Sequence, residues 1–437
     1  MSVQSRSWSL RARPGGVAYP AAFAILLFIA AWLVLHHGWF ARGQIIDTPV
    51  YQHYGDAMAQ GQVPYRDFSV EYPPGALPTF VLPALGHVGS EAGFRRSFET
   101  LMWACGGTML LAIALSLGAL KASAARVYGT LALAAVSPLL LGSVVLSRYD
   151  LWPAALTAGA IAALVSRRLR LGHGLLGVGI AAKVWPGVLV PLALAYVWKE
   201  RGRREALVCL GVLVAVVAAI VVPFVALAPG GVWESVVRQA TRPLQVESLG
   251  AALLVASHHV FGTGVRMVSS HGSQNLGGSA ADTIGAVQSV LQVAALLGVW
   301  LAFARRPSSR EDLARFGAAA VVAFVAFGKV LSPQFLIWLI PVVPLVRRWA
   351  VWVLFVDALV LTQSWFPQRY WDYALHFNPT TTAVVLARDV VLVGLLLALL
   401  VPDWKAAPTL RQRLRQRLGV HDDERLGRAG QRDVEGA

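Results

Sequence analysis

The chain carries few charged residues for its length. Of its 437 residues, 14% are Asp, Glu, Lys or Arg and 56% are hydrophobic, with a mean hydropathy of +0.59. A soluble protein of this size has about a quarter charged residues, so the composition excludes an ordinary soluble domain. The apolar residues form continuous runs of about 20 residues rather than alternating segments, which predicts membrane-spanning helices and excludes a transmembrane β-barrel.

Cysteine is scarce as well. The two cysteines, Cys105 and Cys209, both lie in apolar runs. They supply neither a disulfide framework nor the spacing of a zinc site, so we expect small buried hydrophobic side chains without a redox role. The histidines likewise lack the HExxH spacing of a zinc helix. His258, His259 and His271 are therefore expected to be solvated loop residues, and no metal site is predicted.

Acidic residues are too few to balance the basic ones. The chain has 38 Lys and Arg against 23 Asp and Glu, which gives a net charge of +15. The excess lies mostly in short loops between apolar runs and in the C-terminal segment, as in the cytoplasmic loops of membrane proteins. We therefore expect a lipid bilayer, and not nucleic acid, as the partner of this charge. The first apolar run is too long for a signal-peptide core and lacks a cleavage site, so it is predicted to be an uncleaved first helix.

The apolar runs predict an all-α polytopic membrane protein with about twelve spans. They fall at about 20–41, 92–119, 123–146, 150–167, 171–183, 185–198, 205–228, 282–304, 311–328, 333–346, 348–366 and 380–401. The fifth, sixth and tenth are short enough to be tilted pairs or re-entrant pieces packed against protein. Residues 1–404 are expected to form one membrane-embedded domain. The basic segment 405–437 is predicted to lie in the cytoplasm, first as a helix on anionic lipid and then disordered.

The basic residues of every short loop fall on one side of these spans. Basic loops stay in the cytoplasm, so both termini are predicted to be cytoplasmic. The opposite, outer face receives a first loop at 42–91 and a long loop at 229–281, which is a candidate for gating. It also receives polar or aromatic motifs at helix ends, at 147–150, 183–186, 329–334 and 365–378. Polar groups near membrane level are costly unless they line a cavity, so we expect the outer face to hold the site.

The first outer loop concentrates acids and tyrosines. Asp47 stands directly before a Thr-Pro pair, which is a good arrangement for a helix N-cap. The same carboxylate is placed to remove a proton from a hydroxyl group as that oxygen attacks, and the residues alone leave both interpretations open. The EYPPG segment at 71–75 is a rigid turn, because proline fixes φ and removes a donor. It serves either as architecture or to position Glu71, Tyr65 and Tyr72 against a substrate.

Three cations occupy the other outer motifs. Arg148 either anchors the interface together with Asp150 or grips a phosphate through two parallel hydrogen bonds. Lys183 lies at the break between two short spans, where phosphate binding and snorkelling are both open. Lys329 and Gln334 flank a Ser-Pro pair that is predicted to begin a helix, whose free N–H groups would favour an anion. A purely structural role for this last motif stays open.

The order of these motifs resembles a known family. They are Asp47, PYRDF at 64–68, EYPPG at 71–75, RYD at 148–150, KVWP at 183–186 and KVLSPQFLIWLIP at 329–341. Together they are similar to the bacterial, mainly actinobacterial, polyprenol-phosphate-mannose-dependent mannosyltransferases of the GT-C superfold. That family includes the phosphatidylinositol-mannoside α-1,2-mannosyltransferase. The resemblance covers the chain up to its basic C-terminal segment.

The resemblance implies a glycosyltransferase that moves a sugar, mannose, from a polyprenyl-phosphate donor to a glycolipid or cell-envelope glycan on the outer face of the plasma membrane. It implies inversion at the anomeric carbon, Asp47 as general base, and neither a nucleotide cofactor nor a required metal. The residue patterns add Arg148, Lys183, Lys329 and Gln334 as contacts of the donor phosphate. Substrate positioning is assigned to Glu71, Tyr65, Tyr72, Asp150, Trp365 and His376.

An alternative function from another class is a transporter or flippase of a lipid-linked sugar, which also needs outward polar groups and lipid-sized grooves. Such transporters tend to show two related halves with broken helices near the bilayer midplane. No repeat is visible in this sequence, and its distinctive residues gather on one face. The enzyme is therefore the preferred hypothesis.

Overall fold

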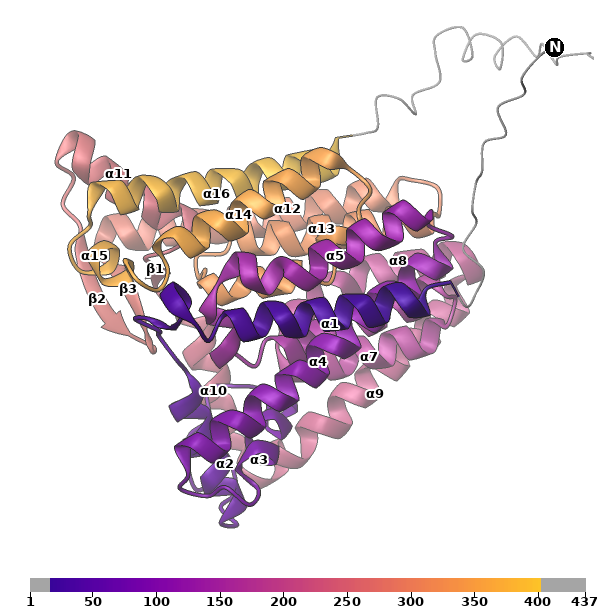
Figure 1. Ribbon diagram of the computed structural model, residues 1–437, viewed down its shortest axis with the longest axis horizontal. Helices are drawn as coiled ribbons and strands as arrows, with labels where there is room; N and C mark the ends of the chain where they lie inside the picture. The colour runs from indigo at the N-terminus through magenta and orange to yellow at the C-terminus, as the bar shows by residue number, and fades with distance from the viewer. Residues whose placement is uncertain (1–15, 402–437) are drawn as a thin grey trace, which may run out of the picture. The chain divides into compact units, whose positions relative to one another are not determined.

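The computed structural model of the protein describes residues 16–401, and within this range the chain is mostly helical (Figure 1). The longer apolar helices are α1 (Ala18–Val34), α4 (Glu91–Ala119), α5 (Ala124–Leu141), α6 (Leu151–Val165), α7 (Leu169–Ala182), α8 (Val190–Arg201), α9 (Arg203–Leu227), α12 (Ser279–Ala304), α13 (Arg310–Ala326), α14 (Trp349–Trp365) and α16 (Pro379–Leu400). The connections contain α2 (Thr48–Ala59), α3 (Pro78–Ala84), α10 (Pro229–Ala240), α11 (Leu249–Phe261), α15 (Tyr370–Ala374) and the 3-10 helices η1 (Gly38–Ala41), η2 (Pro74–Ala76), η3 (Ser143–Ser147) and η4 (Trp185–Leu189).

Five of these helices, α4, α5, α9, α12 and α16, are both long and apolar enough to cross a membrane. Together with the shorter apolar helices they confirm the predicted all-α polytopic membrane fold. The predicted span 333–346 differs, because it forms the 3-10 helices η5 (Pro333–Leu339) and η6 (Val343–Leu345) in place of one α-helix. Pro341 and Pro344 explain this, since a proline inside an α-helix removes a backbone hydrogen bond and clashes with the preceding turn.

The long outer segment 229–281 is folded. Besides α10 and α11 it contains β1 (Leu244–Gln245), β2 (Arg266–Ser270) and β3 (Ser273–Gly277), which form an antiparallel sheet in the order β1-β3-β2. The β2–β3 hairpin turns at His271 and Gly272, which have φ of +54° and +66°. Positive φ at both central residues is the backbone of a tight two-residue hairpin turn. Figure 1 shows the sheet beside α15, at one end of the array of helices.

An aromatic cluster holds the first outer loop against the start of α6. Tyr51 of α2 stacks on Phe80 of α3 with ring centroids 4.7 Å apart, and meets Tyr149 edge-on at 5.7 Å. Tyr72 of the EYPPG segment meets the same Tyr149 ring at 5.1 Å. Aromatic pairs of this geometry add about 0.5–1.5 kcal/mol each to the free energy of area burial. The cluster therefore fixes the loop that carries Asp47 relative to the helix that follows Arg148.

At the helix ends opposite the first outer loop, charged residues form contacts between helices. Arg126 of α5 donates two hydrogen bonds, of 2.6 and 2.8 Å, to the carboxylate of Glu311 in α13. Arg310 donates to the Ala119 carbonyl at 3.1 Å, and Lys199 donates to the Arg306 carbonyl at 2.7 Å. Loops that the sequence assigned to one side of the membrane thus contact one another. The predicted segment 405–437 lies outside the described residues.

Gly75 allows a close backbone approach next to the site. An added Cβ at this position would lie 2.5 Å from the carbonyl carbon of Ala181, at the end of α7. The indole N–H of Trp152 in α6 donates to the Gly75 carbonyl at 3.1 Å. The EYPPG turn therefore fits against the end of α7 that leads directly into Lys183.

We expect Gly75→Ala to destabilise the protein by about 1–3 kcal/mol, because the new methyl group overlaps backbone atoms that cannot move away cheaply. The thermal unfolding midpoint of the protein in detergent measures this effect. Gly211→Ala in α9 is the matched control, since an added Cβ there meets no atom of the described chain within 4 Å. Equal midpoints for the two variants would contradict the proposed close fit.

Candidate active site

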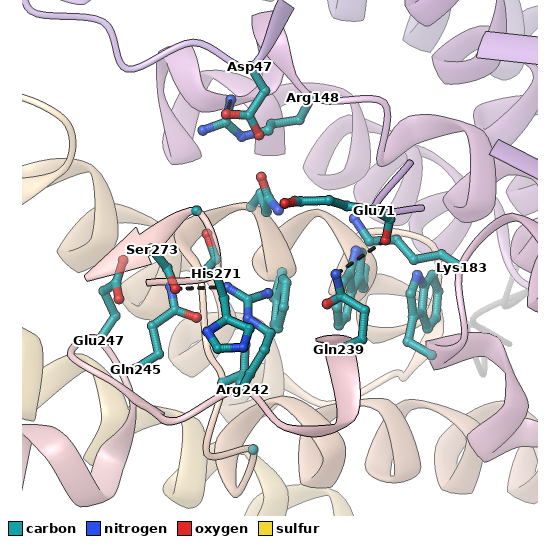
Figure 2. Close-up of a pocket in the computed structure, with 18 of the residues that line it drawn as sticks. Asp47, Glu71, Arg148, Lys183, Gln239, Arg242, Gln245, Glu247, His271 and Ser273 are labelled. Carbon is teal, nitrogen blue, oxygen red and sulfur yellow. Dashed lines mark hydrogen bonds and ion pairs between the residues drawn. The ribbon is translucent and has the colours of Figure 1, made fainter. Parts of the chain in front are cut away.

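Most of the predicted site residues surround one cavity of about 480 Å³ (Figure 2). The chain folds so that a loop after α1, the EYPPG turn, the η3–α6 junction, the α7–η4 break and the loop before η5 all reach it. The predicted residues that line it are Asp47, Glu71, Tyr72, Arg148, Lys183, Lys329 and Gln334. The sequence-based expectation that the outer motifs converge on a cavity is consistent with this arrangement.

Asp47 presents its carboxylate to the cavity. It occupies the N-cap position of α2, yet within residues 16–401 its side chain makes no capping hydrogen bond. One carboxylate oxygen instead lies 2.9 Å from Nη1 of Arg148, and the hydroxyl of Tyr51 donates to the other at 3.5 Å. The side chain is 30% exposed. The geometry therefore favours a chemical role for this carboxylate over helix capping.

The surroundings make Asp47 a stronger base than an ordinary aspartate. Burial raises its pKa from the usual 3.8, because a charged carboxylate loses solvation there. The guanidinium of Arg148 opposes this shift, and the nearby charge of Asp150 adds to it. A carboxylate with a raised pKa that still reaches a cavity is suited to accept a proton from a substrate.

Lys183 forms an ion pair with Asp150 on the side away from the cavity. The ammonium lies 2.6 Å from Oδ1 of Asp150, which is fully buried and also accepts a 2.5 Å hydrogen bond from the indole of Trp338. The ammonium also lies 4.5 Å from the centre of the Tyr149 ring. The sequence assigned Asp150 to substrate positioning, whereas the structure places it beneath Lys183, outside the cavity lining. Asp150 therefore contacts Lys183 and does not face the cavity.

Among the described cations that line the cavity, Lys329 has the least restrained side chain. Its backbone carbonyl accepts a 2.9 Å hydrogen bond from the Gln245 amide. Its ammonium has no acidic or hydrogen-bonding partner among the described residues. Nearby, Oε1 of Gln334 is buried and, in the same range of the chain, also unpartnered. The predicted α-helix start at this motif is a seven-residue 3-10 helix, η5, so the motif offers a ligand side chains rather than the dipole of an α-helix.

Besides Asp150, three predicted positioning residues, Tyr65, Trp365 and His376, lie outside the cavity lining. The Tyr65 hydroxyl donates to the Tyr72 carbonyl at 2.5 Å, so it supports the EYPPG turn. Trp365 is only 1% exposed and packs on Tyr370, with ring centroids 6.1 Å apart. His376 is exposed on the turn that follows α15. Trp371 of α15 lines the cavity and is 48% exposed.

The segment 229–281 supplies cavity residues that the sequence analysis missed. They are Gln239, Arg242, Gln245, Glu247, His271, Ser273 and Gln274. Burial raises the pKa of Glu247 to about 7. Two signals were available, because Leu244-Gln245-Val246-Glu247 alternates apolar and polar residues as a strand does and His-Gly is a possible hairpin turn. His271, expected to be solvated, lies at the cavity.

The EYPPG turn is also clamped from this side. Arg238 of α10 pairs with the Glu71 carboxylate at 2.8 Å, and the side chain of Gln239 donates to the Glu71 carbonyl at 3.2 Å.

Within residues 16–401, no three His, Cys, Asp or Glu side chains gather as metal ligands would. The site therefore offers a carboxylate base next to three cations. This set of groups suits proton removal coupled to departure of an anionic group.

Comparison with known proteins identifies one family. A family model described as "Glycosyltransferase family 87" matches residues 70–333, which is more than half of the chain. The matched range contains Glu71, Arg148, Lys183 and Lys329, and it begins after Asp47. A search of curated proteins found no match.

Arg148→Gln is expected to move the acid limb of the pH profile of kcat/KM for sugar transfer to higher pH. A base works only when deprotonated, so activity rises with pH through the pKa of Asp47, and removing the neighbouring cation raises that pKa further. Arg66→Gln, which removes a cation paired with Asp67 in the same outer loop, is the control. An acid limb that does not move in Arg148→Gln would show that Asp47 is not the titrating base.

Asp150→Asn is expected to destabilise the protein by about 3–5 kcal/mol, because it leaves the buried ammonium of Lys183 without its counter-charge. Replacing both residues, by Asp150→Asn with Lys183→Met, should recover most of the stability without recovering activity. Thermal unfolding and transfer assays on both variants measure the two effects. A double variant that transfers sugar normally would exclude Lys183 from the chemistry.

Proposed function

We propose that this chain, which belongs to glycosyltransferase family 87, moves mannose from a polyprenyl-phosphate donor to a glycolipid or cell-envelope glycan. Family 87 is a GT-C-type family of membrane glycosyltransferases. The observation that carries this proposal is the placement of Asp47 beside Arg148, Lys183 and Lys329 on one cavity. Transfer of a sugar from a lipid phosphate requires both a base for the incoming hydroxyl and cations for the departing phosphate.

The three cations suit a phosphate leaving group. A sugar phosphodiester carries one negative charge, and the polyprenyl phosphate that leaves carries two. Fixed cations that stabilise this additional charge lower the barrier, which is the role that a metal ion plays in other transferases. Lys183 is fixed by Asp150, whereas Lys329 has no partner of its own among the described residues. Lys329 is therefore free to follow the phosphate as the bond breaks.

Asp47 would take the proton of the acceptor hydroxyl as its oxygen attacks the anomeric carbon. The bond from that carbon to the phosphate oxygen breaks on the opposite side, so the configuration inverts. In the free protein Arg148 shields Asp47 at 2.9 Å. A bound phosphate would attract the Arg148 guanidinium and leave Asp47 as an unshielded base at the moment of transfer.

The aromatic wall beside Lys183 suits the lipid part of the donor. Trp185 and Trp338 stack with ring centroids 5.3 Å apart, and Phe335 stacks on Trp338 at 3.9 Å. Val184 next to them is 68% exposed. We place the first isoprene units on this wall. The basic residues at the helix ends opposite the cavity contact one another. Basic loops stay in the cytoplasm, which supports a cytoplasmic location for the termini and a site on the outer face of a bacterial plasma membrane.

The direct test is sugar transfer from synthetic polyprenyl-phosphate mannose by the purified protein in detergent with EDTA, against a panel of mannosylated lipid acceptors. We expect a glycosylated product and metal-independent turnover. Detergent leaves no second compartment, so a flippase would bind the donor without consuming it. Donor that is bound but never consumed with any acceptor would contradict the proposal.

Asp47→Asn is expected to lower kcat by at least about 10²–10⁴-fold with donor binding retained, because the amide cannot accept the proton. Asp67→Asn is the matched control in the same outer loop, where the carboxylate pairs with Arg66 at 2.9 Å. Turnover and donor binding are measured on both variants. An Asp47→Asn protein with normal kcat would rule out this base.

A further inference from the structure

One wall of the cavity plays no part in the transfer steps described above. It is formed by β1, by the residues that follow it, and by the β2–β3 hairpin. Gln245 and Glu247 there are 3% and 2% exposed. In the described part of the chain, Oε1 of Gln245, Oε2 of Glu247 and Oε1 of Gln274 have no hydrogen-bond partner. Buried polar atoms are rarely left unpaired, so a group of them on one cavity wall indicates a ligand that pairs them.

The unpaired side-chain atoms of Gln245, Glu247 and Gln274 are hydrogen-bond acceptors. The amide nitrogen of Gln274 donates to Ser269 at 3.4 Å. In both glutamines the unpaired side-chain atom is the carbonyl oxygen. Either protonation state of Glu247 also leaves an accepting oxygen. Such a surface attracts hydroxyl groups and disfavours phosphate or carboxylate groups.

This wall lies apart from Asp47, Arg148 and Lys183, whereas Gln245 is joined to Lys329 through the hydrogen bond from its backbone amide. Figure 2 shows Gln245, Glu247 and Ser273 on one side of the view and Lys183 on the other, with Asp47 and Arg148 above. Arg242, which lines the cavity beside this wall, donates from Nη2 to Ser273 at 3.1 Å, and its Nε has no hydrogen-bond partner among the described residues. The cavity thus has a cationic side and a side rich in hydrogen-bond acceptors.

The backbone of the wall is fixed from several directions. The Val246 amide donates to the Gln274 carbonyl at 3.1 Å, and the Tyr373 hydroxyl donates to the Val246 carbonyl at 2.7 Å. Arg388 of α16, which is fully buried, donates to the Glu247 carbonyl at 2.7 Å. Fixed hydrogen-bond acceptors lose little freedom when a ligand binds, which favours recognition of a defined shape.

We propose that Gln245, Glu247 and Gln274 form the subsite for the acceptor sugar and select a neutral saccharide with free hydroxyl groups over an anionic one. The inference rests on the proposed function, because the acceptor must lie where its hydroxyl reaches Asp47. Trp371, exposed on the same cavity, offers an apolar face for the sugar ring. A phosphorylated or carboxylated sugar is rejected here because its charge meets carbonyl oxygens.

Two measurements on Gln245→Met and Gln274→Met test this subsite. In the first, a soluble mannobioside, and separately inorganic phosphate, are titrated into the purified full-length protein and followed by calorimetry. In the second, KM is measured for the acceptor and for the donor. Each variant is expected to weaken mannobioside binding and raise the acceptor KM by up to about tenfold, the effect of one lost hydrogen bond, with donor KM and phosphate binding within about twofold.

Gln60→Met is the matched control, since Gln60 lies exposed at the end of α2, outside the cavity lining. Unchanged mannobioside affinity in both variants would overturn the subsite, and so would a rise in donor KM with an unchanged acceptor KM. A wild-type protein that transfers no sugar would contradict the proposed function instead. The mannobioside titration would in that case still decide whether the subsite exists.

Discussion

The site depends on the buried ion pair between Asp150 and Lys183. A carboxylate with no solvent exposure must be neutralised by a close partner, and Asp150 has the ammonium of Lys183 at 2.6 Å and the indole of Trp338 at 2.5 Å. These residues come from three segments far apart in the chain. The pair therefore fixes the start of α6, the break after α7 and the η5 segment relative to one another. Buried pairs contribute little net stability, so its main consequence here is position.

Around this pair the cavity divides chemically. Arg148, Lys183 and Lys329 give one side a positive potential, and the 245–247 and 274 region gives the other a row of carbonyl and carboxylate oxygens. Asp47 pairs with Arg148 and therefore lies next to the cationic side of the cavity. A phosphate and a hydroxyl-rich sugar would each find a compatible surface without competing for the same groups. The same division explains how one cavity would orient two substrates around one base.

Much of this arrangement was predictable from the sequence, because it depends on features that are local in the chain. Apolar runs indicated the helices, and basic loops indicated which helix ends lie together. Asp47, Arg148, Lys183 and Lys329 stand at helix ends on the same predicted side, which was enough to expect them on one cavity. The role of Asp150 was not predictable, because its contact with Trp338 joins residues 188 positions apart.

Other differences have equally specific causes. Trp365 and Trp371 are close in sequence, but the rotation of α14 and of the short α15 about their axes determines which tryptophan reaches the cavity. The hydrophobic pattern alone does not give that rotation. The segment 229–281 has strands of two to five residues, and the short alternation at 244–247 does not by itself place them on the cavity. Its contribution to the cavity arises from pairing between β1 and β3, a contact that is not local in the chain.

The most direct test of the account is a structure of the protein bound to a non-hydrolysable phosphonate analogue of polyprenyl-phosphate mannose. The account predicts the phosphonate between Arg148, Lys183 and Lys329, the isoprenoid on the Trp185–Trp338 wall, and the Asp47 carboxylate facing the anomeric carbon from the opposite side. A phosphonate bound against Gln245 and Glu247, or a sugar turned away from Asp47, would contradict it.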